Sequence, residues 1–378
     1  MRIGTREIGP EFPPYIIAEL GVNHDGDPAR ALELVRLAAG AGADAIKLQL
    51  FRADLLMSKA AKLAAYQKAA GETDPIEMLR RLELSIDDMA PCVQLAHELG
   101  IHAIVSVFSV ELVPIAETLP WDAYKTASPD IINKPLLDAL AATGKPLIIS
   151  TGASTLDEVT RAVEWLKPIH DRLAVLQCVS SYPTPESEME IGGILAIAAV
   201  FPGAIGYSDH SMAHRSGVPV AAGAFLLEKH FTYDRHAHGP DHTASLIPWM
   251  MMRYCEEARR VAKSLPAVVP RDIESLFERI RGVHPSSDEA IAMDAAFMAA
   301  RYAPVKRVLP IEQDVRTASR QSLTTTCDLP AGHILTRSDL TIKRPGTGIP
   351  PYELDATLGR RLARAIEADL PLTQQDLQ

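Results

Sequence analysis

Between residues 15 and 265 the chain repeats one unit, a short apolar run followed by an amphipathic segment. The apolar runs predict strands that begin at Tyr15, Ala43, Ile101, Trp121, Lys145, Leu173, Ala204 and Ala224. Helix-start signals lie between them: Asp27 precedes Pro28, and Ser154 and Thr155 precede another amphipathic stretch. Eight such units predict an α/β fold, the (β/α)8 or TIM barrel. An open doubly wound sheet shows the same alternation, but it more often carries a GxGxxG turn where this chain reads ELGVNHDG.

The repeat of apolar runs and amphipathic segments ends after residue 265, and the remaining sequence predicts two further parts. Residues 266–314 are punctuated by Pro and Arg and read as a linker, within which DEAIAMDAAFMAARYA predicts a helix. From residue 315 short β-like runs such as DLTIKRP alternate with turns such as RPGTG. The chain is therefore expected to hold a barrel domain over 1–265, a linker over 266–314 and a small β-rich domain over 315–378.

Composition narrows the classes of partner. The formal net charge of −10 argues against a broad surface for nucleic acid or for an anionic membrane. No run approaches the ~20 apolar residues of a membrane span, and the N-terminus lacks the apolar stretch of a signal peptide. The four cysteines form no CxxC pair, which argues against a structural zinc site and against disulfides. A reducing, cytoplasmic location is the expectation.

Every predicted strand ends in polar residues, although the strands themselves are apolar. These end residues are Glu19, Lys47, Gln49, Ser106, Lys125, Ser128, Ser150, Ser180, Tyr182, Ser208, His210, Glu228 and His230. One such residue alone is usually a helix cap or a solvated end, but barrels of this kind place their active sites at the strand ends. Lys47 and Lys125 lie within strand patterns, where a buried cation needs an anion. Together with the serines they predict a pocket for phosphate and carboxylate.

His210 and His230 end two consecutive predicted strands. Two imidazoles on neighbouring strands would make half of an open metal site, with substrate oxygens and water completing the coordination. The alternative is that each histidine hydrogen-bonds a carboxylate, such as Asp209 or Glu228. Three further histidines lie in the loop DRHAHGPDHTASL, where substrate contacts or solvation are favoured over metal binding.

Ten strings in fixed order carry a family resemblance. IIAELGVNHDG, ADAIKLQLF, LELS, YKTAS, TGKPLIISTGAST, SSYPTP, SDH, EKHFT, GPDHTASL and KRPGTG resemble the N-acetylneuraminate (sialic acid) synthase family. The likeness covers about Tyr15 to Leu246 and Arg320 to Ala365. It implies a (β/α)8 barrel with a C-terminal antifreeze-like (SAF) domain. It also implies condensation of phosphoenolpyruvate with N-acetylmannosamine, or with a related N-acyl sugar in the legionaminate and pseudaminate branches, using Mn²⁺ or Mg²⁺.

The same resemblance implies roles for individual residues. The phosphoenolpyruvate-binding set would be Lys47, Ser106, Lys125, Ser128, Ser150, Ser180 and Ser208. The metal ligands would be His210 and His230, with Glu228 beside them. The sugar-handling set would be Glu19, Gln49, Tyr182, Asp241 and Arg344. Glu19, Lys47, Lys125 and Glu228 would be catalytic, and Arg344 would come from the partner of a domain-swapped homodimer.

Some positions depart from the family pattern and leave the sugar open. Ser106 stands where a threonine is frequent, Gln177 where a histidine is common, and Gln321 where a second arginine is usual. GETDPIEM carries no asparagine where better-known sialate synthases contact the acyl group, while LELS argues against the pseudaminate branch. A synthase of 3-deoxy sugar-acid phosphates would need an extra basic pocket. A sugar-binding module on a dead barrel is the non-enzyme alternative, against which Glu19, His210 and His230 argue.

Overall fold

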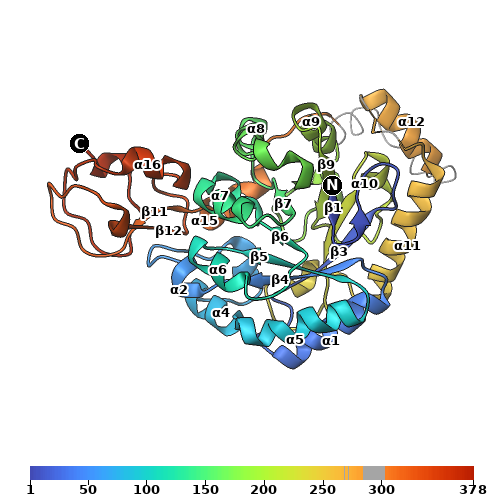
Figure 1. The fold of residues 1–378 in the computed structure, drawn as a ribbon, viewed down its shortest axis with the longest axis horizontal. Helices are drawn as coiled ribbons and strands as arrows, with labels where there is room; N and C mark the ends of the chain where they lie inside the picture. The colour runs from blue at the N-terminus through green and yellow to red at the C-terminus, as the bar shows by residue number, and fades with distance from the viewer. Residues whose placement is uncertain (268, 271, 284–302) are drawn as a thin grey trace.

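The computed structural model describes residues 1–267, 269–270, 272–283 and 303–378. Eight parallel strands close into a barrel in the order β10-β3-β4-β5-β6-β7-β8-β9 (Figure 1). Their bounds are β3 Tyr15–Gly21, β4 Ala45–Leu50, β5 His102–Val107, β6 Ala123–Lys125, β7 Leu147–Ser150, β8 Leu173–Cys178, β9 Ala204–Asp209 and β10 Leu226–His230. Each begins within two residues of its predicted start. The predicted (β/α)8 barrel is confirmed.

Helices cover the outside of the barrel. The main ones are α1 (Pro28–Gly40), α5 (Ile86–Glu98), α7 (Lys134–Ala142), α8 (Leu156–Trp165), α9 (Gly193–Val200), α10 (Gly217–Ala221) and α11 (Pro248–Ser264). Short helices α2 (Ala53–Leu56), α3 (Ala65–Ala69) and α4 (Pro75–Leu82) fill the long connection after β4, and α6 (Val113–Ala116) follows β5. The predicted caps are present: Asp27 accepts from the Ala29 amide and Thr155 accepts from the Glu158 amide.

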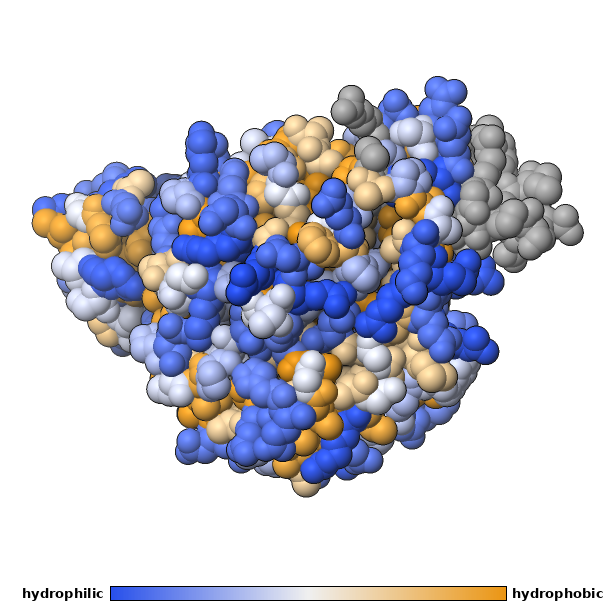
Figure 2. Space-filling model, turned by 45° about the vertical axis from the view of Figure 1, so that its right-hand side comes forward, coloured by the Kyte–Doolittle hydropathy of each residue, from blue (hydrophilic) through white to orange (hydrophobic). Residues whose placement is uncertain are grey.

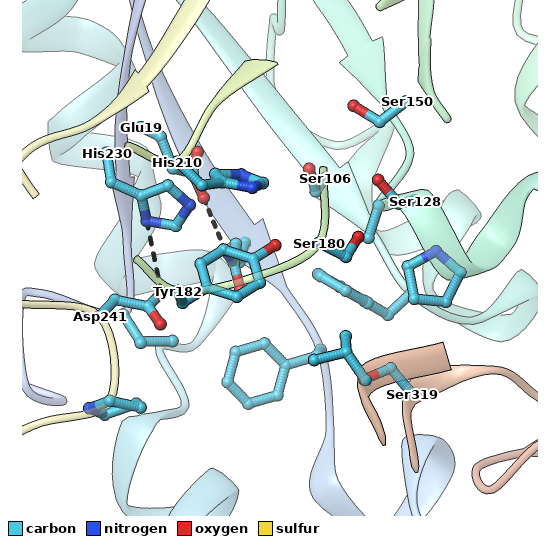
Figure 3. Close-up of a pocket in the computed structure, with 18 of the residues that line it drawn as sticks. Glu19, Ser106, Ser128, Ser150, Ser180, Tyr182, His210, His230, Asp241 and Ser319 are labelled. Atoms are coloured by element: carbon cyan, nitrogen blue, oxygen red, sulfur yellow. Dashed lines mark hydrogen bonds and ion pairs between the residues drawn. The ribbon is translucent and has the colours of Figure 1, made fainter. Parts of the chain in front are cut away.

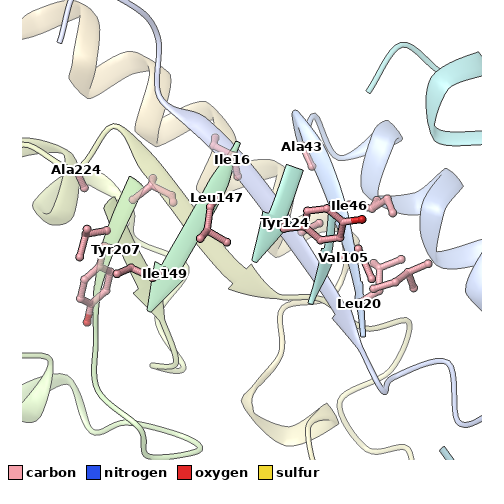
Figure 4. Close-up of a cluster of buried hydrophobic side chains, with 14 of the residues drawn as sticks. Ile16, Leu20, Ala43, Ile46, Val105, Tyr124, Leu147, Ile149, Tyr207 and Ala224 are labelled. Carbon is pink, nitrogen blue, oxygen red and sulfur yellow. The ribbon is translucent and has the colours of Figure 1, made fainter. Parts of the chain in front are cut away.

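The two faces of each strand explain why the site lies at one end of the barrel. Outward residues such as Ile16, Ile46 and Ile149 pack under the helices (Figure 4). Apolar inward residues near the strand starts enclose a second core that Ile3 and Ile8 complete. Ile3 ends β1 (Arg2–Ile3), which pairs antiparallel with β2 (Arg6–Glu7), and Ile8 follows β2. Polar inward side chains such as Glu19, Lys47 and Lys125 gather near the strand ends, and so the polar pocket forms there.

The part predicted as a linker is packed wherever the structure describes it. Helix α12 (Ile273–Val283) contacts α10, and its Leu276 and Ile280 are buried in the main core. The helix predicted from DEAIAMDAAFMAARYA lies, apart from its last residue, outside the described residues. From Ala303 the chain crosses back over the barrel through α15 (Gln313–Ser319).

The C-terminal domain is a small β-rich unit, seen at the left of Figure 1. Strand β11 (Ser322–Thr325) pairs antiparallel with β12 (Leu340–Lys343), and α16 (Leu354–Thr357) follows. Its own core contains Leu323, Leu362 and Leu372. Over the described ranges no helix is long and apolar enough to cross a membrane. Figure 2 shows hydrophilic and hydrophobic side chains interspersed over one face of the molecule.

Candidate active site

A single pocket at the carboxyl ends of the strands is lined by every side chain singled out above as a site residue (Figure 3). They come from the strand ends and adjoining loops, with Asp241 from the loop after β10 and Arg344 from the C-terminal domain. The pocket holds about 940 Å³ of space, part of it open to solvent. The structure thus brings the predicted residues together, while their individual roles stay predictions.

Two lysines and two glutamates form the floor of the pocket. Lys47 Nζ lies 3.0 Å from Glu19 Oε2 and 3.3 Å from Glu228 Oε2, and Lys125 Nζ lies 3.3 Å from Glu228 Oε1. Strand register produces this arrangement, because Glu19 pairs with Lys47 across β3 and β4. All four side chains are buried. Burial lowers the pKa of Lys47, but the two carboxylates outweigh it and the net shift is upward.

The serine hydroxyls surround the lysines. Lys47 Nζ donates to Ser106 Oγ at 3.2 Å, and Lys125 Nζ donates to Ser150 Oγ at 2.7 Å. Ser208 Oγ donates to Glu228 Oε1 at 2.8 Å, while Ser128 Oγ accepts from the Gly152 amide at 2.9 Å. Ammonium groups beside rotatable hydroxyls are suited to bind the oxygens of a phosphate and a carboxylate.

His210 and His230 face the same pocket, with ring centroids 5.3 Å apart. His210 Nδ1 lies 2.7 Å from the Val179 carbonyl, which places its proton on Nδ1 and leaves a lone pair on Nε2. His230 Nδ1 lies 3.5 Å from Asp241 Oδ2, as Figure 3 marks. Burial lowers the pKa of His230 well below its usual value, which favours the neutral imidazole. In the described residues no group of three or more His, Cys, Asp or Glu side chains forms a metal site.

Aromatic and cationic side chains form the outer part of the pocket. The Tyr182 ring lies 5.0 Å from that of Tyr66 and 4.2 Å from that of His210. The Arg344 guanidinium lies 5.7 Å from the Phe108 ring. The Arg344 backbone lies beside the end of α2, where its amide donates to the Leu56 carbonyl at 2.8 Å. In this chain Arg344 therefore lies in the pocket of its own barrel.

Sequence reasoning missed part of the lining. One wall is apolar and comprises Val22, Phe51, Leu56, Met78, Leu79, Leu82 and Phe108. Tyr66, Gln67, Val315 and Ser319 also line the pocket. The apolar face of the amphipathic helix α4 consists of Met78, Leu79 and Leu82. From the sequence alone, an apolar helix face that packs in the core cannot be told from one that contacts a ligand. Val22, Phe51 and Phe108 directly follow β3, β4 and β5, but they are apolar, and the sequence pattern of polar strand ends does not include them.

Comparison with known proteins identifies the family. The NeuB family profile matches residues 34–269, and that of the SAF domain matches residues 320–378. The N,N'-diacetyllegionaminic acid synthase of Legionella pneumophila is 34% identical over 99% of this chain and 98% of its own length. Among solved structures, the spore coat polysaccharide biosynthesis protein SpsE of Bacillus subtilis matches with a TM-score of 0.78 and 26% identity, covering 100% of this chain and 99% of that one. The N-acetylneuraminic acid synthetase of Leptospira borgpetersenii, in complex with citrate, matches with a TM-score of 0.63 and 28% identity over 76% of this chain and 98% of that one. The chain belongs to the NeuB family and carries a C-terminal SAF domain.

Proposed function

We propose that this chain is a nonulosonic acid synthase of the sialic acid type, which condenses phosphoenolpyruvate with an N-acyl sugar aldehyde and releases phosphate. The observation that carries the proposal is the composition of one pocket in a NeuB-family chain. Lys47, Lys125 and a ring of serines lie beside Glu19 and two histidines. The chain also aligns over nearly its full length with a relative named N,N'-diacetyllegionaminic acid synthase.

The lysine end of the pocket accounts for phosphoenolpyruvate. Its phosphate and carboxylate need at least two cations, and Lys47 and Lys125 are both buried there. Fixed donors in a site shielded from water stabilise charge on a leaving group better than water does. The phosphate leaves with cleavage of its bond to carbon 2, and the same lysines would stabilise it as it departs.

The bonds balance without an imine. Carbon 3 of phosphoenolpyruvate bonds to the aldehyde carbon, and the aldehyde oxygen takes up a proton. Water adds at carbon 2 and loses a proton to leave a hydroxyl group. As the carbon 2–oxygen bond to phosphate breaks, this hydroxyl gives its proton to the departing phosphate and becomes the ketone. Glu19 is placed to carry the proton, because burial raises its pKa above the ordinary carboxyl value.

A divalent cation, Mn²⁺ or Mg²⁺, fits the two histidines. His210 presents an Nε2 lone pair, and His230 is neutral, with an Nδ1 that makes no hydrogen bond within the described part of the chain. When bound there, such a cation would supply Lewis acidity to a carbonyl oxygen.

The sugar half of the pocket supports an unphosphorylated substrate. Among the described lining residues the lysines and arginines are Lys47, Lys125 and Arg344, so after phosphoenolpyruvate binds only Arg344 remains for a second anion. The apolar wall next to Arg344 favours methyl groups over a sugar phosphate. The first candidate is therefore N-acetylmannosamine. The second, which the apolar wall favours, is a 2,4-diacetamido-6-deoxyhexose of the legionaminate type.

Product mass spectrometry tests the proposal. The enzyme is incubated with phosphoenolpyruvate, Mn²⁺ and, separately, N-acetylmannosamine, a 2,4-diacetamido-6-deoxymannose or arabinose 5-phosphate. We expect one of the two N-acyl sugars to give a nonulosonic acid together with inorganic phosphate. A higher kcat/KM for arabinose 5-phosphate would instead assign the chain to the 3-deoxy sugar-acid phosphate synthases. No phosphate release with any of the three would support the binding-module alternative.

We also propose that two copies exchange their C-terminal domains, so that Arg344 of one serves the barrel of the other. The contacts of this domain with the barrel are non-covalent, such as the Lys59–Glu367 ion pair and the Ser58–Arg344 backbone hydrogen bond. Such contacts form equally well within a chain and between identical chains. The support for exchange is thus that the C-terminal domain can make the same contacts with its own barrel or with the barrel of a second copy.

A further inference from the structure

The segment from Lys306 to Gln321, here called the clasp, joins the C-terminal domain to the barrel loops that follow β7 and β8. Lys306 Nζ donates to the Cys178 carbonyl at 3.2 Å near its start, and Gln321 accepts from Asn133 Nδ2 at 2.6 Å at its end. Between these points lies Glu312, at the end of the 3₁₀ turn Pro310–Glu312. The clasp therefore lies against the segments that follow β6, β7 and β8, which include Ser128 and Ser180.

Glu312 is a fully buried carboxylate whose hydrogen bonds all go to backbone amides. Its Oε1 accepts from the Ala153 amide at 2.6 Å and from the Ser180 amide at 2.7 Å. Its Oε2 accepts from the Leu309 amide at 2.9 Å. Burying a carboxylate is costly unless it is hydrogen-bonded, and an apolar residue here would leave three buried N–H groups without this partner. Packing alone does not account for a glutamate at this position.

The two amides belong to loops that touch each other under the pocket. A Cβ on Gly152 would lie 2.1 Å from Ser180 Oγ and 2.8 Å from Ser128 Oγ, so these loops meet at a distance that only glycine allows. Ala153 has a φ of +50°, in the left-handed region that an alanine adopts only under constraint. Its amide bonds Glu312 and its carbonyl accepts from Arg320 Nη2 at 3.1 Å, so the clasp holds it from both sides.

We infer that Glu312 is a positioning residue for the phosphoenolpyruvate end of the pocket. By holding two amides at one oxygen, it fixes the spacing of the Ser180 and Gly152–Ala153 loops, and with it the placement of the Ser128 and Ser180 hydroxyls. It does so without lining the pocket itself. The C-terminal part of the chain then serves both halves of the site, with Arg344 at the sugar and Glu312 behind the phosphoenolpyruvate. The inference rests on the proposed assignment of phosphoenolpyruvate to the lysine end.

The test compares Glu312→Gln with Arg307→Gln. Glutamine keeps the shape and one acceptor oxygen but loses the charge that strengthens the two amide hydrogen bonds. Arg307→Gln removes the Arg307–Glu190 ion pair, 2.8 Å long, from the same clasp at a side chain that is 55% exposed. We expect Glu312→Gln to weaken phosphoenolpyruvate binding about tenfold by calorimetry while the KM for the sugar changes less than about twofold. Arg307→Gln should leave both unchanged.

A double-mutant cycle with Ser180→Ala separates positioning from a general loss of fold. If Glu312 acts through the Ser180 loop, the two changes together should weaken phosphoenolpyruvate binding by clearly less than the product of their separate effects. Full additivity would overturn the inference. So would a Glu312→Gln protein that melts earlier yet binds phosphoenolpyruvate like the wild type. Wild-type protein that binds no phosphoenolpyruvate would instead refute the proposed function.

Discussion

Glu19 and Glu228 contact the same buried lysine, yet their surroundings shift their pKa values in opposite directions. Burial raises the pKa of Glu19, and Lys47 only partly opposes this. For Glu228 burial also raises the pKa, but Lys125, Lys47 and the Ser208 hydroxyl outweigh it and the net shift is downward. When the pKa values of two neighbouring carboxyl groups are shifted in opposite directions, one group can carry a proton while the other stays ionised. In the proposed mechanism Glu228 would be a counter-ion for the lysines, and Glu19 would be the group that exchanges a proton.

Replacing Glu19 with glutamine should therefore lower kcat more than it weakens binding. The amide keeps the shape and the contact with Gln49 but cannot carry the proton, so kcat should fall about 100-fold or more. The dissociation constant of phosphoenolpyruvate should stay within about threefold, because the Lys125 ion pair is untouched. Steady-state kinetics and calorimetry measure the two quantities. A Glu19→Gln enzyme with wild-type kcat would remove Glu19 from the mechanism.

Lys47 and Lys125 should bind anions and form no covalent adduct. Phosphoenolpyruvate already contains a masked enol, so an imine would serve no step. Borohydride added with pyruvate or phosphoenolpyruvate should leave the mass of the intact protein unchanged. A lysine adduct trapped in wild-type protein and absent from Lys125→Ala would place the chain among imine-forming lyases.

His210→Ala and His230→Ala should each abolish turnover and keep the fold. Each change removes one of the two imidazoles found among the described residues that line the pocket. Chelation of the wild-type enzyme should abolish phosphate release, and added Mn²⁺ should restore it. Circular dichroism of both variants is the control. Full activity after exhaustive chelation would contradict the proposed metal dependence.

At the scale of elements, helices α8 and α15 are joined by a partly buried ion-pair cluster. Glu158, in the first turn of α8, bonds Arg316 Nη2 at 2.9 Å and Arg320 Nη1 at 2.5 Å. Burial raises the pKa of Glu158, but the two arginines outweigh it and the pKa falls to about 2. The Glu158 side chain is 11% exposed, so solvent screens this cluster weakly. The clasp is thus attached to the barrel by charge at α8 as well as by Glu312.

This attachment gives stability a defined pH dependence. Because the folded pKa of Glu158 lies below its unfolded value, its contribution is present above about pH 4.5 and is lost as the pH falls towards 2. Glu158→Gln should lower the free energy of unfolding by roughly 2–3 kcal/mol at pH 7, and the difference should shrink between pH 4.5 and 2. Urea unfolding at pH 7, 4 and 3 measures it.

Glu164→Gln on the same helix is the matched control, since Glu164 pairs with Lys167 at a side chain that is 68% exposed. It should change the free energy of unfolding by less than about 0.5 kcal/mol at any pH. Equal losses in the two variants at pH 7, or a Glu158→Gln loss that stays constant down to pH 3, would show that the arginine cluster contributes little.

Strands and helix caps were predictable because each rests on local chemistry. A short apolar run that forms a strand, and Asp27 or Thr155 before a helix, depend on neighbours along the chain. The polar strand ends could be grouped because a closed parallel barrel gathers all such ends at one rim. The apolar wall from α4 and the contacts of Glu312 depend on packing between distant segments. In the sequence, α4 looks like an ordinary amphipathic helix, and Glu312 looks like a glutamate exposed to solvent.

At the scale of the whole molecule, the pocket needs two separate parts of the chain. The barrel supplies the charged floor and the histidines, while the C-terminal domain supplies Arg344 next to Tyr66 and Phe108. Backbone hydrogen bonds between Leu56 or Ser58 and Arg344 hold this domain against the loop after β4. Docking of the domain therefore decides whether the sugar half of the pocket is complete.

Mixing two inactive variants tests whether copies exchange these domains. Arg344→Ala should weaken use of the sugar and spare phosphoenolpyruvate binding, and His230→Ala should abolish turnover. If domains are exchanged, a mixed dimer holds one pocket with an intact barrel and an intact arginine. A mixed dimer should then have about one half of the wild-type activity, and an equimolar, randomly paired mixture about one quarter, in line with closed twofold assembly. Co-purification through different tags must first confirm subunit exchange; inactive mixed dimers, or a fully active monomer, would refute the model.

The contacts of Glu312 and Arg344 also bear on how the protein is made. Glu312 bonds Ala153 and Ser180, and Arg344 bonds Leu56, so the site joins segments that leave the ribosome far apart in time. All eight strands of the barrel precede residue 231. A nascent chain can therefore close its barrel while the clasp and the C-terminal domain are still being translated. Until then the Ala153 and Ser180 amides lack their carboxylate, and catalytic competence arrives only with the last part of the chain.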